Sequence, residues 1–176
     1  MQPMATLRCR NLRACATLPP LGGNRPTAMT LVEKQEQLTA TLSRIRDAQE
    51  RFAYLVERGR KQEAIEAASK SDAFKVVGCL SNLWLVPRFR DGKCYFQSDA
   101  DSVIVKAIAG LLCEFYSGHG PEEILSIDPS FLGRVGITQH LTPNRRNALS
   151  RVWEKIRDFA LSHQPPSPVE GNTERA

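Results

Sequence analysis

Cys79 is the residue whose type and position in this sequence are best suited to chemistry. It follows Gly78 in the stretch VVGCLSNLWLV, residues 76–86, between two runs rich in valine and leucine. The apolar runs indicate strands, and glycine permits backbone conformations that other residues disfavour, so GCLS is predicted to form a turn or short loop. A cysteine there can project its sulfur away from a sheet. The alternative is a small apolar residue that fills space, because free cysteines are often buried.

A nucleophilic cysteine acts as its thiolate, and only a few per cent of a thiol with a pKa of about 8.5 is ionised near neutral pH. A cysteine hydrolase would need a histidine beside Cys79. His119 lies in a glycine-flanked loop and His163 at a helix end, whereas His140 stands next to a second notable segment. A hydrolase that uses Cys79 and His140 is therefore one alternative.

Two other cysteines offer a different chemistry. Cys94 falls in a predicted strand and Cys113 in a predicted apolar helix, where both are expected to pack in the core. Together with Cys79 they provide the thiolates that a zinc or iron–sulfur scaffold would use. No pair of cysteines has CxxC spacing, so a metal site is an alternative without local support and no metal is expected.

The second notable segment is HLTPNRRNAL, residues 140–149. Thr142 can cap a final helix that begins at Pro143. Arg145 and Arg146 then fall in the first turn, where positive charge is unfavourable with the helix dipole. Arginine placed against this local preference suggests an acidic partner, within the chain or on another protein; the alternative is two solvated side chains.

The elements that must position these residues follow from periodicity and turn signals. Helices are predicted over residues 31–44 and from Asp47, three residues before Glu50, to Gly59. Strands are predicted at 74–77, at 83–89 and from 94, with Asp-Gly at 91–92 as a hairpin turn. A buried helix over 103–116, short helices between 121 and 132 and the helix from 143 follow. The order predicts an α+β fold, a small three-stranded antiparallel meander with helices packed on one face.

Composition limits the class of protein. The 176 residues suffice for one domain, with 41% hydrophobic and 24% charged residues. No apolar run approaches the roughly 18 residues that span a bilayer, so no membrane association is expected. Residues 1–28 carry four arginines and no acid, so they account for +4 of the net charge of +5. The remaining residues are nearly neutral, and no nucleic-acid partner is indicated.

The domain organisation follows from the same pattern. Residues 1–28 and 164–176 lack apolar periodicity and are predicted to be disordered, on either side of a domain at 29–163. The odd count of five cysteines fits reduced thiols in the cytoplasm. The acid-free, arginine-bearing residues 1–28 also have the composition of an organelle transit peptide, whereas the plainer interpretation is an upstream extension with Met29 as the start.

Three ordered segments resemble one family, the SufE/CsdE sulfur-acceptor proteins of iron–sulfur cluster assembly. VVGCLSNLWLV is similar to the family's G-C-x-S-x-x-W. SDADSVIVKA is similar to D-S-D-x-x-I-V-K-G, and TQHLTPNRRNAL to H-L-T-P-S-R-x-x-G-L. The matching residues include Gly78, Cys79, Ser81, Trp84, Asp99, Asp101, Lys106, His140 and Arg145. The resemblance covers about residues 38–162. Leu80 departs from the polar residue of many members, and residues 61–73 lack a proline common in the family.

The resemblance implies a SufE-like (IscU-like) fold and a specific activity. Cys79 would accept persulfide sulfur from a SufS/CsdA-type cysteine desulfurase, stimulate that enzyme, and pass the sulfur to an iron–sulfur scaffold. The pyridoxal phosphate would belong to the desulfurase, so no cofactor is expected here and the chain is not itself an enzyme. Gly78 and Ser81 would shape the loop, and Leu80 would help to shield the sulfur. Trp84 would pack against the core, with shielding of the sulfur as the alternative. Asp99 and Asp101 would cap the helix from 103, with the pocket or the partner surface as the alternative, and His140 and Arg145 would line the pocket or contact the partner.

Overall fold

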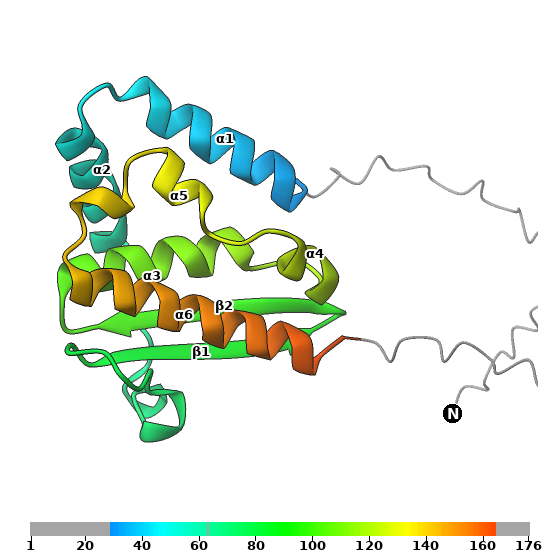
Figure 1. Ribbon diagram of the computed structural model, residues 1–176. Coiled ribbons are helices and arrows are strands. Elements are labelled where there is room, and N and C mark those ends of the chain that lie inside the picture. Colours follow the sequence, from blue (N-terminus) through cyan, green and yellow to red (C-terminus); the bar gives the residue numbers. More distant parts are fainter. Residues whose placement is uncertain (1–28, 63, 165–176) are drawn as a thin grey trace, which may run out of the picture.

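The computed structural model describes residues 29–62 and 64–164 (Figure 1). The predicted disordered segments, 1–28 and all but the first residue of 164–176, lie outside these described residues. The described helices are α1 (Leu31–Arg44), α2 (Ala48–Arg60), α3 (Val103–Tyr116), α4 (Pro121–Ser126), α5 (Phe131–Arg134) and α6 (Pro143–Ser162). The strands are β1 (Leu83–Arg90) and β2 (Lys93–Ala100), and three short 3-10 helices are η1 (Ala67–Ser69), η2 (Asp72–Phe74) and η3 (Thr138–His140).

The sheet is an antiparallel hairpin of β1 and β2, in which Leu83 lies opposite Ala100. Its turn has positive φ at Asp91 (52°) and Gly92 (73°), as a two-residue hairpin turn of the predicted kind requires. The described residues form a two-stranded sheet, so the prediction of three strands is wrong in that detail. The residues predicted as the first strand form η2 and then a single bridge between Lys75 and Trp84.

A physical reason for the missing strand lies just after that bridge. Val76 donates its backbone N–H to the Leu83 carbonyl at 2.8 Å, which is one hydrogen bond rather than a ladder. Two residues later Gly78 has a φ of +87°, a left-handed conformation that redirects the chain and ends an extended run. Val76 and Val77 therefore have a high β-propensity, but the extended segment that contains them is too short to pair as a strand.

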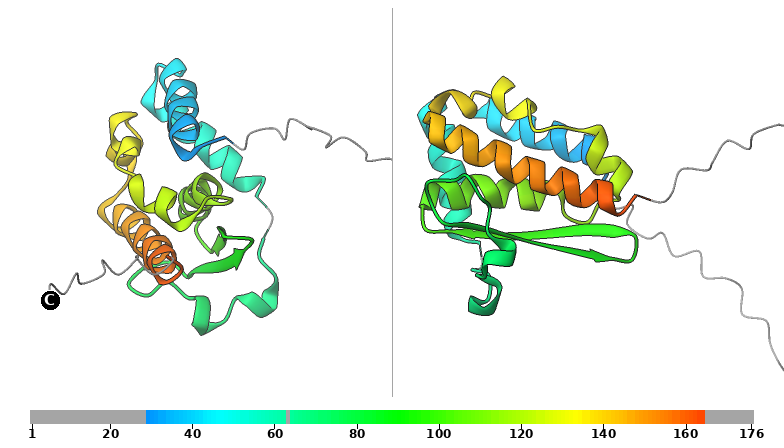
Figure 2. Two further views of the ribbon diagram at one scale, coloured as in Figure 1. Left: turned by 90° about the vertical axis from the view of Figure 1, so that its right-hand side faces the viewer. Right: turned by 60° about the horizontal axis from the view of Figure 1, so that its bottom comes forward.

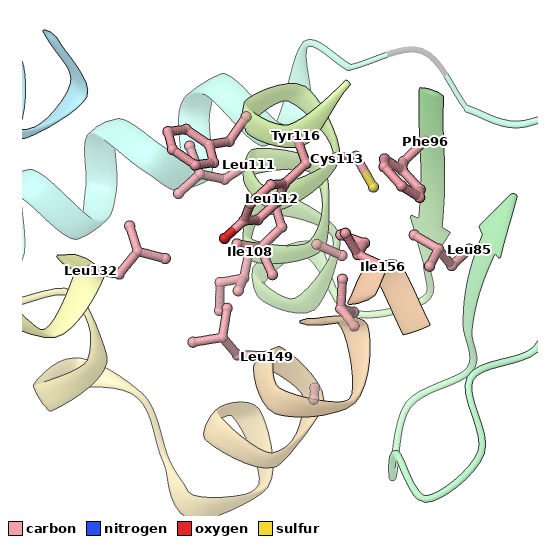
Figure 3. Packing of buried hydrophobic residues seen from close by; sticks show 14 of the residues in the cluster. Leu85, Phe96, Ile108, Leu111, Leu112, Cys113, Tyr116, Leu132, Leu149 and Ile156 are labelled. Carbon is pink, nitrogen blue, oxygen red and sulfur yellow. The ribbon is translucent and has the colours of Figure 1, made fainter. Parts of the chain in front are cut away.

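The core lies between the hairpin and the helices that cover one of its faces. Figure 2 shows the helices gathered on one side of the hairpin, whereas the segment containing η1 and η2 lies on the other side. Leu85 and Phe96 point from the strands toward α3, where Leu112 is fully buried, and Ile156 of α6 joins the same cluster (Figure 3). Each such side chain contributes about 1.5–3 kcal/mol through burial. The α+β prediction with helices on one face is thus confirmed.

The buried cluster holds α3 and α6 together, and the N-terminal ends of these two helices lie against the segment that contains Cys79.

None of the described helices is both long enough and apolar enough to cross a membrane.

Candidate functional site

Cys79 lies in a loop, residues 77–82, whose two ends are fixed by hydrogen bonds. The Val76–Leu83 backbone bond closes the start of the loop. At its end, the Asp101 N–H donates to the Asn82 carbonyl at 3.1 Å, and Asn82 Nδ2 donates to Asp101 Oδ2 at 2.6 Å. The loop therefore leaves and rejoins the sheet at defined points. Asp101, predicted to cap the helix from 103 or to lie at the pocket or the partner surface, is one of the residues that hold it.

The middle of the loop rests on α6. Asn147 Nδ2 donates to the Gly78 carbonyl at 2.8 Å. A Cβ atom on Gly78 would lie 3.4 Å from Arg151 Nε, and the positive φ of Gly78 disfavours any side chain there. Two structural features therefore favour glycine at position 78, namely its left-handed backbone conformation and its closeness to α6.

Cys79 faces a hollow of about 230 Å³ between its own loop and the N-terminal parts of α3 and α6. The lining residues are Cys79, Leu80, Ser81, Ser102, Val105, Thr142, Asn144, Arg145 and Ala148. Cys79 is half-buried, and its surroundings mix apolar side chains with hydroxyls and one guanidinium group. A hollow of this size accommodates a few atoms beyond the thiol, and it is partly open to solvent.

The protonation state of Cys79 reflects this position. Burial raises the pKa of the Cys79 thiol, and the charge of Arg151 lowers it by a smaller amount. The net result is a pKa above the ordinary value, so the thiol is mostly protonated near neutral pH while the loop is in this position. A movement that exposes the sulfur would remove the larger of the two effects and favour the thiolate.

Several of the predicted site residues meet at this hollow. Gly78, Leu80 and Ser81 belong to the loop, and Arg145 reaches the hollow from the first turn of α6. The structure therefore places Arg145, which is unfavourable for the helix dipole, at the hollow that Cys79 also lines. His140 is exposed in η3 and is not among the lining residues. The hydrolase alternative therefore has no histidine at the hollow.

Trp84 and Asp99 lie in a separate cluster. Asp99 is buried on β2 and accepts from Lys70 at 2.8 Å and from Lys106 at 3.1 Å. Burial alone would raise the pKa of Asp99, but hydrogen bonds from Lys70 and Lys106 hold it below the ordinary value. Trp84 lies opposite Asp99 in the hairpin, and the Lys70 ammonium is 5.6 Å from its ring centroid.

These contacts correct one expectation for Asp99. Its oxygens accept from two lysines, and it is not among the residues that line the hollow. The first turn of α3 is capped instead by Ser102, whose Oγ accepts from the Val105 N–H at 3.5 Å. Asp99 therefore ties the segment before the Cys79 loop to β2 and α3.

The other described cysteines are different in kind from Cys79. Cys94 is fully buried and Cys113 nearly so, and burial raises the pKa of these thiols to about 11 and about 12. Across residues 29–62 and 64–164, no group of three or more histidine, cysteine, aspartate or glutamate side chains is placed to hold a metal ion. The scaffold alternative, which needs Cys79, Cys94 and Cys113 to converge, has no assembled ligand set in this part of the chain.

Asn82, Asn147 and Arg151 are loop contacts that reasoning from the sequence missed. Asn147 and Arg151 are separated by four residues and so share a helix face, which is a usable signal. That signal becomes specific only when the face of α6 that meets the loop is known.

The comparisons with known proteins identify the family of this chain. The family described as "SufE: Fe-S metabolism associated domain" matches residues 36–160. The chain belongs to the SufE family. A relative from Synechocystis sp. (strain ATCC 27184 / PCC 6803 / Kazusa), "Uncharacterized SufE-like protein slr1419", is 30% identical over 151 residues, covering 86% of this chain and 87% of the relative. The family resemblance drawn from the three motifs is confirmed, and the role of this SufE protein is in iron–sulfur metabolism.

A solved structure supports the fold. The solution structure of a hypothetical protein from Thermus thermophilus matches with a TM-score of 0.62 at 22% identity. The match covers 74% of this chain and 95% of that one. At this identity the likeness concerns the architecture, which is the α+β arrangement predicted from the sequence.

Proposed function

We propose that this SufE protein accepts persulfide sulfur on Cys79 from a SufS/CsdA-type cysteine desulfurase, stimulates that enzyme, and passes the sulfur on for iron–sulfur cluster assembly. In the transfer step the Cys79 thiolate attacks the terminal sulfur of the desulfurase persulfide. A new S–S bond forms at Cys79, the S–S bond of the donor breaks, and the donor cysteine leaves as a thiolate that takes up a proton. One sulfur atom is transferred from the desulfurase cysteine to Cys79, with no net oxidation or reduction.

The observation that carries the proposal is the position of Cys79, half-buried on a loop that borders a partly open hollow. Sulfur transfer needs neither an oxyanion hole nor a base–acid triad, but it needs a thiol that reaches into another protein's active site. A loop on a rigid hairpin supplies this reach. A carrier must also protect its persulfide from reaction with other thiols. The hollow beside Cys79 provides a sheltered position for it.

The surface around the loop supports docking to a partner. Val77 and Leu80 flank the Gly78–Cys79 pair with relative exposures of 80% and 84%, which is unusual for two aliphatic residues so close together. Arg145 adds a positive charge at the rim of the hollow. This combination fits an apolar entrance with an acidic group on the desulfurase. The pyridoxal phosphate of the reaction belongs to that partner, and we assign no cofactor to this chain.

A mass measurement tests the proposal. The protein is incubated with a cysteine desulfurase and free cysteine, and its intact mass is determined without reductant. We expect a gain of one or more sulfur atoms that is lost in Cys79→Ser and kept in Cys94→Ala and Cys113→Ala. A gain that survives in Cys79→Ser would overturn the assignment. Stoichiometric metal in the purified protein, lost on mutation of the cysteines, would favour the scaffold alternative instead.

A second measurement concerns the movement of the loop. If Cys79 leaves the hollow to meet the desulfurase, its alkylation by iodoacetamide becomes faster when an inactive desulfurase is added, because exposure removes the burial that disfavours the thiolate. An unchanged rate in the presence of a bound desulfurase would exclude this movement.

A further inference from the structure

Two residues of α6 contact the peptide that carries Cys79. Asn147 holds the Gly78 carbonyl through a hydrogen bond of 2.8 Å. Arg151 lies one helical turn later, with its Nε 3.4 Å from the position that a Cβ of Gly78 would occupy. Both side chains are on the solvent-exposed surface of α6, so their contacts with the loop are not a consequence of core packing. Neither residue lines the hollow in front of the sulfur.

We propose that Asn147 and Arg151 form a latch that seats the Gly78–Cys79 peptide on α6 and keeps a positive charge next to this peptide. Both are positioning residues in this proposal, which rests on the proposed function of Cys79 as the sulfur carrier. Asn147 determines where the loop returns after it has been displaced. Arg151 determines how readily the returned sulfur exists as an anion.

The two contributions are separable by chemistry. The Asn147 amide donates to a backbone carbonyl, so it acts on the position of the loop and not on the charge of the sulfur. The guanidinium of Arg151 carries a positive charge, so it favours a thiolate or persulfide anion over the neutral form. In agreement, the Arg151 charge lowers the pKa of Cys79 and opposes the larger, raising effect of burial.

The environment of Arg151 limits the size of its effect. Arg151 Nη1 donates to Glu154 at 2.9 Å, which fixes the guanidinium on the surface of α6 and partly neutralises it. Solvent screens an exposed charge further. We therefore expect a change of a few fold in the reactivity of the sulfur, with a clear dependence on salt, rather than loss of function.

Alkylation of Cys79 by iodoacetamide, followed across the alkaline range on the full chain without any desulfurase, tests the latch. In Arg151→Gln the rate near neutral pH falls by about two- to fivefold and the profile moves up by about half a pH unit, the size expected for one partly screened charge. Arg151→Lys restores most of the profile because it keeps the charge. In about 1 M salt the difference between Arg151→Gln and the unaltered protein shrinks, whereas loss of packing would not respond to salt. Arg157→Gln, which removes an exposed arginine of the same helix, is the matched control.

Asn147→Ala has a different expected signature. Its profile keeps the same midpoint or moves down, and its rate at high pH rises several-fold because the loop leaves the hollow more often. Profiles of Arg151→Gln that superimpose on those of Arg157→Gln, or an unchanged rate in Asn147→Ala, would overturn the latch. Because the probe is a small molecule, this result is independent of the sulfur-transfer measurement. A shifted profile in a protein that gains no sulfur would refute the carrier function and leave the latch in place.

Discussion

Gly59 of α2 lies directly against Ala107 of α3. A Cβ atom on Gly59 would overlap the Cα and Cβ atoms of Ala107 and would lie 3.1 Å from its backbone nitrogen. The absence of a side chain at Gly59 therefore allows α2 to approach the central helix. The two helices meet here at backbone distance, and neither can give way without moving the core around it.

Gly59→Ala is expected to destabilise the protein by about 1–3 kcal/mol, although alanine is the better helix former, because overpacking at a backbone contact exceeds the gain in propensity. Urea unfolding followed by tryptophan fluorescence measures the change. Gly110→Ala is the matched comparison, since the three atoms nearest to its Cβ would all belong to the amide end of Gln62, a flexible side chain that can rotate away. We expect Gly110→Ala to stay within about 1 kcal/mol of the unaltered protein. Equal losses in the two variants would contradict the close approach at Gly59.

The three described thiols should react in two separate phases. Cys79 is half-buried on a loop, whereas burial raises the pKa of Cys94 to about 11 and of Cys113 to about 12. In the folded protein at mildly alkaline pH, iodoacetamide therefore modifies Cys79 first, and Cys94 and Cys113 follow only at the rate at which the protein unfolds. Peptide mass mapping after timed quenching gives the order. Labelling of Cys94 at a rate comparable to Cys79 in folded protein would show that the hairpin opens locally.

Local signals in the sequence predict much of this fold. The helices predicted at 31–44 and 103–116 have those limits in the structure. Their starts are marked by caps, such as Thr30, whose side chain accepts from the Glu33 N–H at 3.2 Å. The Asp91–Gly92 turn also carries its own signal. Caps and turns involve residues three or fewer apart, so they are readable without knowledge of tertiary contacts.

Contacts between segments that are distant in the sequence could not be predicted from the sequence alone. Asn147 bonds a carbonyl 69 residues earlier in the chain. Lys70 meets Asp99 across the segment that was expected to form a strand, and no periodicity marks either pair. The loop position of Cys79 was readable from its flanking glycine and apolar runs, but the residues behind it depend on how α6 is rotated against the hairpin.

Lys34 of α1 closes the C-terminal end of the central helix. Its ammonium group donates to the carbonyls of Glu114, Phe115 and Ser117 at 3.1–3.2 Å, where the last turn of a helix leaves carbonyls without partners. Lys34→Met keeps the aliphatic part of the side chain and removes the donors. We expect a loss of about 1–2 kcal/mol in the free energy of unfolding. Lys155→Met, at an exposed position of α6, should change it by less than about 0.5 kcal/mol. A comparable effect of the two substitutions would argue against a capping role.

Asp99 should make a contribution to the free energy of unfolding that depends on pH. Burial alone would raise the pKa of Asp99, but hydrogen bonds from Lys70 and Lys106 and the charge of Lys106 outweigh it and hold this pKa below its ordinary value of 3.8. As pH falls, the unfolded chain therefore takes up this proton before the folded protein does, so the stabilisation is complete above about pH 5 and is lost as pH falls below 3.8 toward the pKa of the folded state.

Asp99→Asn removes that contribution and leaves two lysines without their counter-charge. Because Lys70 is partly exposed, we expect a loss of about 1–3 kcal/mol at neutral pH, less than for a fully buried pair. The difference from the unaltered protein should stay constant from neutral pH down to about pH 5 and shrink below pH 3.8, as measured by urea unfolding at each pH. Asp158→Asn, at an exposed position of α6, should follow the unaltered protein throughout. A difference that stays constant down to about pH 3 would mean that the aspartate acts by its shape rather than its charge.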